Sequence, residues 1–162
     1  MGAIKNGIKS GLLSGFIYFL INSIINFVII IFFIGEIVIA EGVPETTRDL
    51  SIFLTLLINH QIETIFITGL LSGVLFSILL LKYYETIPGT TLKGKTNFFI
   101  IIYWIAFFII IPVYELGFSI IIALPYLITY IVANFLTSLF FGYLIARYNS
   151  KYITQDKNNH PL

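Results

Sequence analysis

The sequence predicts an all-α fold: an integral membrane bundle of four transmembrane helices with both termini in the cytoplasm. Of its 162 residues, 58% are hydrophobic and only 10% are charged, which is more apolar surface than a soluble domain of this size can bury. Uncharged runs such as residues 12–34 match the ~20 residues with which a helix crosses ~30 Å of hydrocarbon. The basic residues fall in segments that a four-span topology places on one side of the membrane.

Four apolar runs are the expected spans of one membrane domain, residues 1–162. They cover about residues 11–34, 62–81, 97–113 and 120–145. The first run is too long for the apolar part of a secretory signal peptide, so we expect it to be retained as a helix. Pro125 is expected to end or kink the fourth helix, and the residues after Tyr148 to form a polar, partly disordered tail.

The segment before the second span needs a separate interpretation. Residues 50–81 are apolar over too great a length for one upright span, and Asn59, His60 and Gln61 interrupt them. We therefore expect a short interfacial helix at about residues 51–58, followed by the second span.

The distribution of lysine and arginine sets the expected orientation. Eight of the nine basic residues precede the first span, join spans two and three, or follow span four, and Arg48 is the exception. Positive charge favours the cytoplasmic side. The sequence therefore predicts a multi-pass protein of the cell membrane with cytoplasmic termini, and its bias toward Ile, Lys and Asn hints at a prokaryotic origin.

Small residues recur at helical spacing in three of the four spans. Helices in lipid associate through close backbone approach at such residues and through interhelical hydrogen bonds. We expect spans one, two and four to pack together, and the bulkier span three to lie outermost or to face another protein. The expected packing residues are Gly7, Gly11, Ser14, Gly15, Gly69, Ser72, Gly73, Ser138 and Gly142.

Three amides, Asn22, Asn26 and Asn134, lie at hydrocarbon depth, where an unpaired amide is costly. They are expected to form interhelical hydrogen bonds, and the alternative is that they line a polar path or a ligand site. The expected outer rim carries Glu36, His60, Glu63 and Glu115. These residues include types that bind metals, but scattered groups at a wet interface are more often simply solvated, so no metal or cofactor is expected.

Residues 89–96, Gly-Thr-Thr-Leu-Lys-Gly-Lys-Thr, match the phosphate-loop pattern G-x-x-x-x-G-K-[ST]. That chemistry needs a strand leading into the loop and a helix leaving it, whereas membrane helices are expected on both sides here, so we interpret the match as chance. Lys82, Lys93 and Lys95 are instead candidates for binding anionic lipid head groups, beside their ordinary role as topology determinants.

The sequence favours a protein without a catalytic site, acting as a structural or assembly subunit of a larger membrane complex. The chain has no cysteine and a net charge of +1, which excludes thiolate chemistry and gives no sign of a nucleic-acid partner. Its expected partners are the lipid bilayer and other membrane protein chains. The alternatives are a small homo-oligomeric channel or transporter, and a lipid-modifying enzyme that uses His60 or Glu63 as acid or base.

Overall fold

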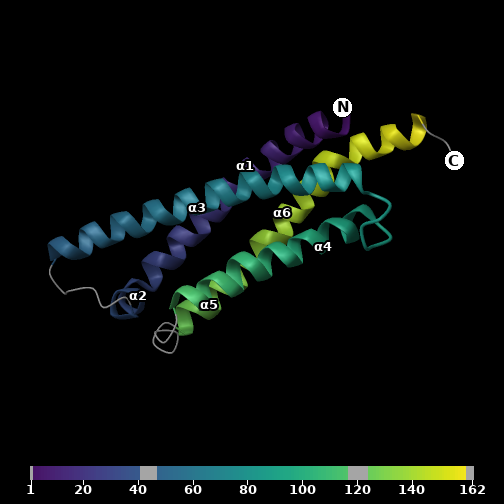
Figure 1. Ribbon diagram of the computed structural model, residues 1–162. Coiled ribbons are helices and arrows are strands. Elements are labelled where there is room, and N and C mark those ends of the chain that lie inside the picture. Colours follow the sequence, from purple (N-terminus) through teal and green to yellow (C-terminus); the bar gives the residue numbers. More distant parts are fainter. Residues whose placement is uncertain (1, 41–46, 117–123, 160–162) are drawn as a thin grey trace.

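The computed structural model describes residues 2–40, 47–116 and 124–159, and every regular element in these ranges is helical (Figure 1). The elements are α1 (Gly2–Phe32), α2 (Ile34–Ala40), α3 (Thr47–Lys82), α4 (Leu92–Ile105), the π-helical turn η1 (Ala106–Ile110), α5 (Ile111–Leu116) and α6 (Leu124–Asn159). The all-α prediction is confirmed for the described part of the chain.

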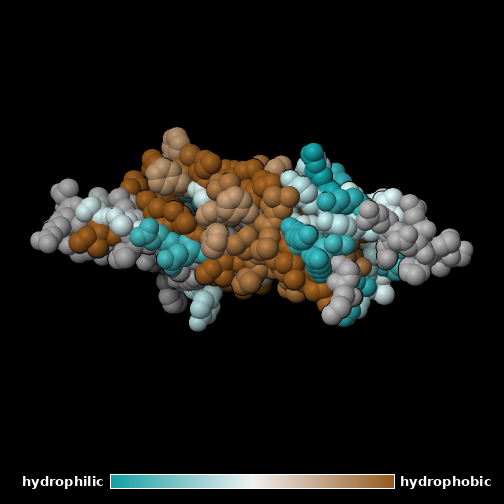
Figure 2. All heavy atoms as spheres, turned by 90° about the horizontal axis from the view of Figure 1, so that it is seen from above, coloured by the Kyte–Doolittle hydropathy of each residue, from teal (hydrophilic) through white to brown (hydrophobic). Residues whose placement is uncertain are grey.

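Three helical segments are long and apolar enough to cross a membrane. They are Ile4–Phe32, Leu92–Ile110 and Leu124–Thr154, and α3 contributes the shorter apolar segment Phe66–Lys82. In space-filling view the middle of the molecule is covered by hydrophobic side chains, and hydrophilic ones gather toward the ends (Figure 2). This distribution is the one expected of a helical protein that lies across a bilayer.

The long helices form an antiparallel bundle in which α1 packs against both α3 and α6, while α4 packs chiefly against α6. The start of α1, the end of α6 and the loop between α3 and α4 lie at the same end of the bundle (Figure 1). We call this the basic end, because it carries the exposed cations Lys5, Lys9, Lys82, Lys93, Arg147 and Lys151.

An aromatic cluster joins the four long helices at the centre of the bundle. Tyr18 of α1 stacks on Phe141 of α6 with ring centroids 4.4 Å apart, and Tyr103 of α4 meets both rings edge-on. Phe76 of α3 stacks on Phe99 of α4 at 5.3 Å. Aromatic pairs in these geometries stabilise a core beyond the area they bury, so the helix expected to lie outermost nevertheless supplies buried rings to the core.

Two helices are longer than the sequence predicts. α3 is continuous from Thr47 to Lys82, although an interruption was expected at residues 59–61. Asn, His and Gln each cost a helix only a few tenths of a kcal/mol, which is less than the cost of nucleating a second helix. Likewise, α6 continues to Asn159, where a disordered tail was expected after Tyr148.

Proline shapes the other two helices. Pro125 is the second residue of α6 as described, and at the start of a helix its missing N–H costs nothing. In the third span, η1 comes just before Pro112, and the N–H of Ile111 bonds to the carbonyl of Ala106, five residues back. Local π turns of this kind accommodate proline in transmembrane helices.

Candidate functional site

The main polar feature of the bundle is the interface between α1 and α6. Ser10, Ser14, Tyr18, Asn22 and Asn26 follow one another at spacing four on α1, and all are at most 4% exposed. Four residues of this row contact α6 in reverse order along that helix: Ser10 meets Asn149, Tyr18 meets Phe141, Asn22 meets Thr137 and Asn26 meets Asn134. Polar and aromatic residues of the two helices therefore meet in register across most of the apolar length.

In the half of this interface away from the basic end, two asparagines form a reciprocal pair. Asn26 Nδ2 donates to Asn134 Oδ1, and Asn134 Nδ2 donates back to Asn26 Oδ1, both over 3.1 Å. The same two amide nitrogens also donate, over 2.8 Å, to the carbonyls of Asn22 and Tyr130 in their own helices. The two side chains therefore satisfy each other in a place where water cannot.

Asn22 connects the same helices one turn further in. Its Oδ1 accepts a hydrogen bond from Thr137 Oγ1 over 2.7 Å, but its Nδ2 is buried and has no hydrogen-bond partner among the described residues. The sequence predicted interhelical hydrogen bonds for Asn22, Asn26 and Asn134. Each of the three is at most 2% exposed and takes part in a hydrogen bond between α1 and α6.

The basic end holds a second polar junction, which the sequence did not indicate. Asn149 is fully buried, accepts from Ser10 Oγ over 2.7 Å and donates to Ser77 Oγ over 3.0 Å. One amide therefore joins α6 to both α1 and α3. Its spacing could have predicted this burial, because Asn149 lies two helical turns beyond Gly142 and continues the row of small and polar residues on that helix.

We expect the variant Asn149→Ala to lose about 2 kcal/mol of stability, because two interhelical hydrogen bonds disappear and two buried hydroxyls lose their shared partner. Reversible unfolding in mixed detergent micelles measures this loss. Ser150→Ala is the matched control, since Ser150 is exposed and its hydroxyl donates to the carbonyl of Arg147 in its own helix. Equal stability of the two variants would contradict a structural role for the junction.

The expected packing glycines lie where α1 crosses α3. A Cβ added at Gly11 would lie 2.4 Å from the Cα of Val74, and one at Gly15 would lie 2.6 Å from the carbonyl oxygen of Gly69. Gly73 faces the carbonyl oxygen of Gly11 in the same way, at 2.5 Å. At these positions the two backbones are in direct contact, which only glycine permits.

The remaining packing candidates are also inside the bundle. Ser14 and Ser138 are fully buried, and Ser72 is 8% exposed. A Cβ at Gly7 would meet Ile78 of α3, and one at Gly142 would lie 2.7 Å from the Ile100 side chain. Gly142 therefore receives a bulky residue of α4, so the fourth predicted span also packs closely against the third.

Where the glycines end, a groove opens between α1 and α3. It has a volume of about 260 Å³ and is lined by Ser23, Ile24, Asn26, Phe27, Ile30, Ile58 and Ile62. Phe19 and Phe66 meet edge-to-face, with centroids 5.1 Å apart, on the side of the groove nearer the glycines. The Ser23 hydroxyl is buried without a hydrogen-bond partner among the described residues.

The segment that matches the phosphate-loop pattern is held in its conformation by contacts within the loop between α3 and α4. Thr91 caps α4 by accepting a hydrogen bond from the Gly94 N–H over 3.1 Å, and Gly89 adopts a φ of +122° against the Gly94 backbone. Lys95 is only 6% exposed, donates to the carbonyls of Tyr84 and Ile87, and lies over the Tyr84 ring. Because a helix precedes this loop, its geometry gives no support to nucleotide binding.

The head-group candidates separate into two kinds. Lys95 fixes the loop between α3 and α4 and has little surface left for a lipid, so its assignment as a head-group ligand is corrected. Lys82 and Lys93 are exposed and stay candidates. Burial of a cation among carbonyls and an aromatic ring has no simple sequence signature, because it depends on how the loop folds back.

Of the outer-rim candidates, the structure describes only the side chain of Glu63. Glu63 is exposed on α3, while the side chains of Glu36, His60 and Glu115 lie outside the described residues. Among the described residues no group of three metal-binding side chains occurs.

Comparisons with protein-family models, with curated proteins and with solved structures find no match to this chain. The fold and the interior define its class on their own: a helical protein with three helices suited to span a membrane and a polar interface buried within the bundle.

Proposed function

We propose that this chain is a four-span integral membrane protein without a catalytic site, and that it serves as a structural or assembly subunit of a larger membrane complex. The supporting observation is that most of its buried asparagine side chains form hydrogen bonds within the bundle. Asn26, Asn134 and Asn149 bond to other parts of the same bundle, and the middle of the face seen in Figure 2 is covered by apolar side chains. A protein of this kind acts through the surfaces that it offers to other chains.

The face of α4 that points away from the bundle supports the same proposal. Trp104 is turned toward α6, where its Nε1 donates to the Ile131 carbonyl over 3.1 Å, so it belongs to the bundle. The outward residues Ile101, Ile102 and Ile105 are 39–51% exposed. This rigid, branched surface is suited to packing against another membrane helix.

Native mass spectrometry tests the proposal on tagged protein extracted from its own membrane in a mild detergent, with every co-purifying chain identified. We expect a stoichiometric complex with at least one other membrane protein. A stable monomer that carries no partner under the same conditions would contradict the proposal.

The proposed orientation places the basic end, with both termini, in the cytoplasm of a cell bounded by this membrane. Cysteine labelling tests it, because the chain has no cysteine of its own. Cysteine introduced at Glu45 is expected to react with an impermeant reagent in intact cells, and cysteine at Thr90 only after permeabilisation. The reverse pattern would contradict this orientation.

The alternative is a small homo-oligomeric channel or transporter. It is favoured by one specific observation, the buried Asn22 Nδ2 and Ser23 Oγ without hydrogen-bond partners among the described residues, since unpaired polar atoms at this depth commonly mark functional positions. Flux in proteoliposomes tests this path. An ion or solute flux that is unchanged in the combined variant Asn22→Leu and Asn134→Leu would contradict it.

A further inference from the structure

The first turns of α1 carry two cations on one face of the helix. Lys5 and Lys9 are four residues apart and exposed, which makes them neighbours on the helix surface. Neither forms an ion pair with any described residue, and the first turn of α1 contains no acidic residue. Like charges at this spacing destabilise a helix, so an anion bound between them relieves a repulsion that the chain itself leaves uncompensated.

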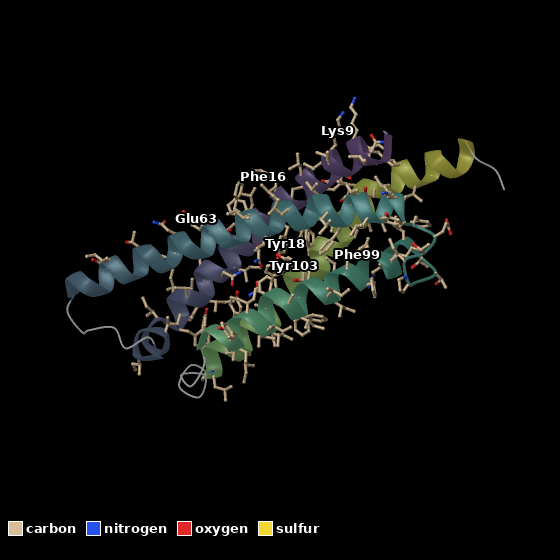
Figure 3. All side chains as sticks on the ribbon, viewed as in Figure 1. Lys9, Phe16, Tyr18, Glu63, Phe99 and Tyr103 are labelled. Atoms are coloured by element: carbon tan, nitrogen blue, oxygen red, sulfur yellow. The ribbon has the colours of Figure 1, made fainter. Side chains whose placement is uncertain are left out.

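Apolar side chains lie beside these two lysines. Ile4, Lys5, Ile8 and Lys9 line a shallow groove of about 580 Å³. Toward the middle of the bundle the same face continues through Leu12 and Phe16, both 46% exposed. Lys9 and Phe16 project to the same side of α1 (Figure 3), as a separation of seven residues requires.

A surface with two cations at one end of an exposed apolar strip matches one kind of molecule, an anionic amphiphile. We propose that this face of α1 binds an anionic phospholipid of the leaflet at the basic end. Its phosphate lies between the ammonium groups of Lys5 and Lys9, and one acyl chain lies along Ile8, Leu12 and Phe16.

The charge of the basic end favours this ligand over a zwitterionic lipid. Lys82, Lys93, Arg147 and Lys151 are exposed at the same end, and Glu85 is the one acidic side chain described there. These cations attract anionic lipid in general, whereas the proposed site belongs to Lys5 and Lys9 because there the charges adjoin an apolar strip. Lipid binding at Lys5 and Lys9 does not depend on the proposed function, since a monomer and a complex subunit would bind the lipid equally.

The test is native mass spectrometry of the full chain in detergent, titrated with dioleoyl phosphatidylglycerol or dioleoyl phosphatidylcholine. We expect the wild type to bind phosphatidylglycerol more tightly, and the combined variant Lys5→Gln and Lys9→Gln to bind it on the order of 30-fold more weakly. The combined variant Arg147→Gln and Lys151→Gln has the same net charge and removes two exposed basic residues, also four residues apart on one helix, from the same end. The affinity of this control variant for phosphatidylglycerol is expected to fall only a few-fold.

Two outcomes would overturn the proposal. Equal losses of phosphatidylglycerol affinity in the two double variants would mean that only the total charge of the basic end matters. Equal binding of dihexanoyl and dioleoyl phosphatidylglycerol by the wild type would mean that a head group is recognised without use of the apolar strip. A melting temperature in lipid-free detergent that matches the wild type shows that Lys5→Gln and Lys9→Gln leave the fold intact, as expected for exposed side chains.

Discussion

Gly11→Ala is expected to destabilise the bundle by about 2–3 kcal/mol, although alanine is the better helix former by ~1 kcal/mol. The new methyl group would lie 2.4 Å from the Cα of Val74 and 2.5 Å from the Gly73 carbonyl oxygen. Both atoms belong to the backbone of α3, so no side chain can rotate away to make room. The two helices must separate, and the dispersion contacts along their crossing are lost together.

The chain offers a graded set of controls for this prediction. Gly35 has nothing within 4 Å of an added Cβ, so Gly35→Ala is expected to be neutral or slightly stabilising. At Gly69 the nearest atom is Tyr18 Cδ1, at 3.2 Å, and a ring can shift by a few tenths of an ångström. Gly69→Ala is therefore expected to fall between the other two.

Reversible unfolding of the three variants in mixed micelles, followed by helical circular dichroism, gives the free energies to be compared. The expected order of stability is Gly35→Ala, then Gly69→Ala, then Gly11→Ala. If Gly11→Ala were as stable as Gly35→Ala, α1 and α3 would not be in backbone contact at this position.

The sequence predicted the helical class and the interior positions of the small residues for a physical reason. In lipid the backbone must satisfy its own hydrogen bonds, so long apolar runs have few structures open to them. Spacing then determines which residues share a helix face, and this is a property of the chain alone. The positions of Gly11, Gly15 and Gly73 against the neighbouring backbone follow from these two constraints.

The ends of the helices were harder to predict, because several weak preferences compete there. Composition indicated a break near Asn59 and a tail after Tyr148, but α3 and α6 continue through both. In α6, the Asn149 side chain bonds to α1 and α3, so tertiary contacts support helix where local composition is polar. Propensity is a weak predictor in such places.

Contacts between residues far apart in the chain could likewise not be predicted from one sequence. Lys95 was a candidate for lipid binding by its charge and position, but the loop folds back and offers it two carbonyls. The bulky third span was expected to lie outermost or to face another protein, yet its Tyr103 is 1% exposed and its Trp104 bonds to α6. Rotation of a helix about its own axis depends on all its neighbours, and a bulky span without small residues gives little sign of it.

The polar interface between α1 and α6 has a consequence for how the chain selects one fold. Apolar side chains in lipid gain little by moving from lipid to a neighbouring helix, so many helix arrangements have similar energies. Hydrogen bonds at fixed positions distinguish among them. The pair of Asn26 and Asn134 and the bond from Thr137 to Asn22 lie in one antiparallel register, and a slip by one residue would leave these polar groups unpaired in hydrocarbon.

The variant Asn134→Leu is therefore expected to cost about 2 kcal/mol, because Asn26 Oδ1 remains buried and loses its interhelical donor. The variant Asn26→Leu is expected to cost a similar amount for the reciprocal reason. When both are changed to Leu, no unpaired amide of this pair is left, and the double variant is expected to be more stable than the sum of the two losses implies. The difference between the summed losses of the single variants and the loss of the double variant measures the coupling energy of the two side chains.

Interhelical hydrogen bonds in membranes average about 0.6 kcal/mol and reach about 1.7 kcal/mol, so a reciprocal pair is expected to give a coupling energy of about 1–2 kcal/mol. Unfolding of the wild type, both single variants and the double variant under one set of micelle conditions yields this coupling. Asn59→Leu is the control for adding an apolar side chain, since Asn59 is exposed on α3, and it should leave stability nearly unchanged. Strict additivity of the two losses would mean that the amides do not bond to each other, and that some other contact determines the register of α1 and α6.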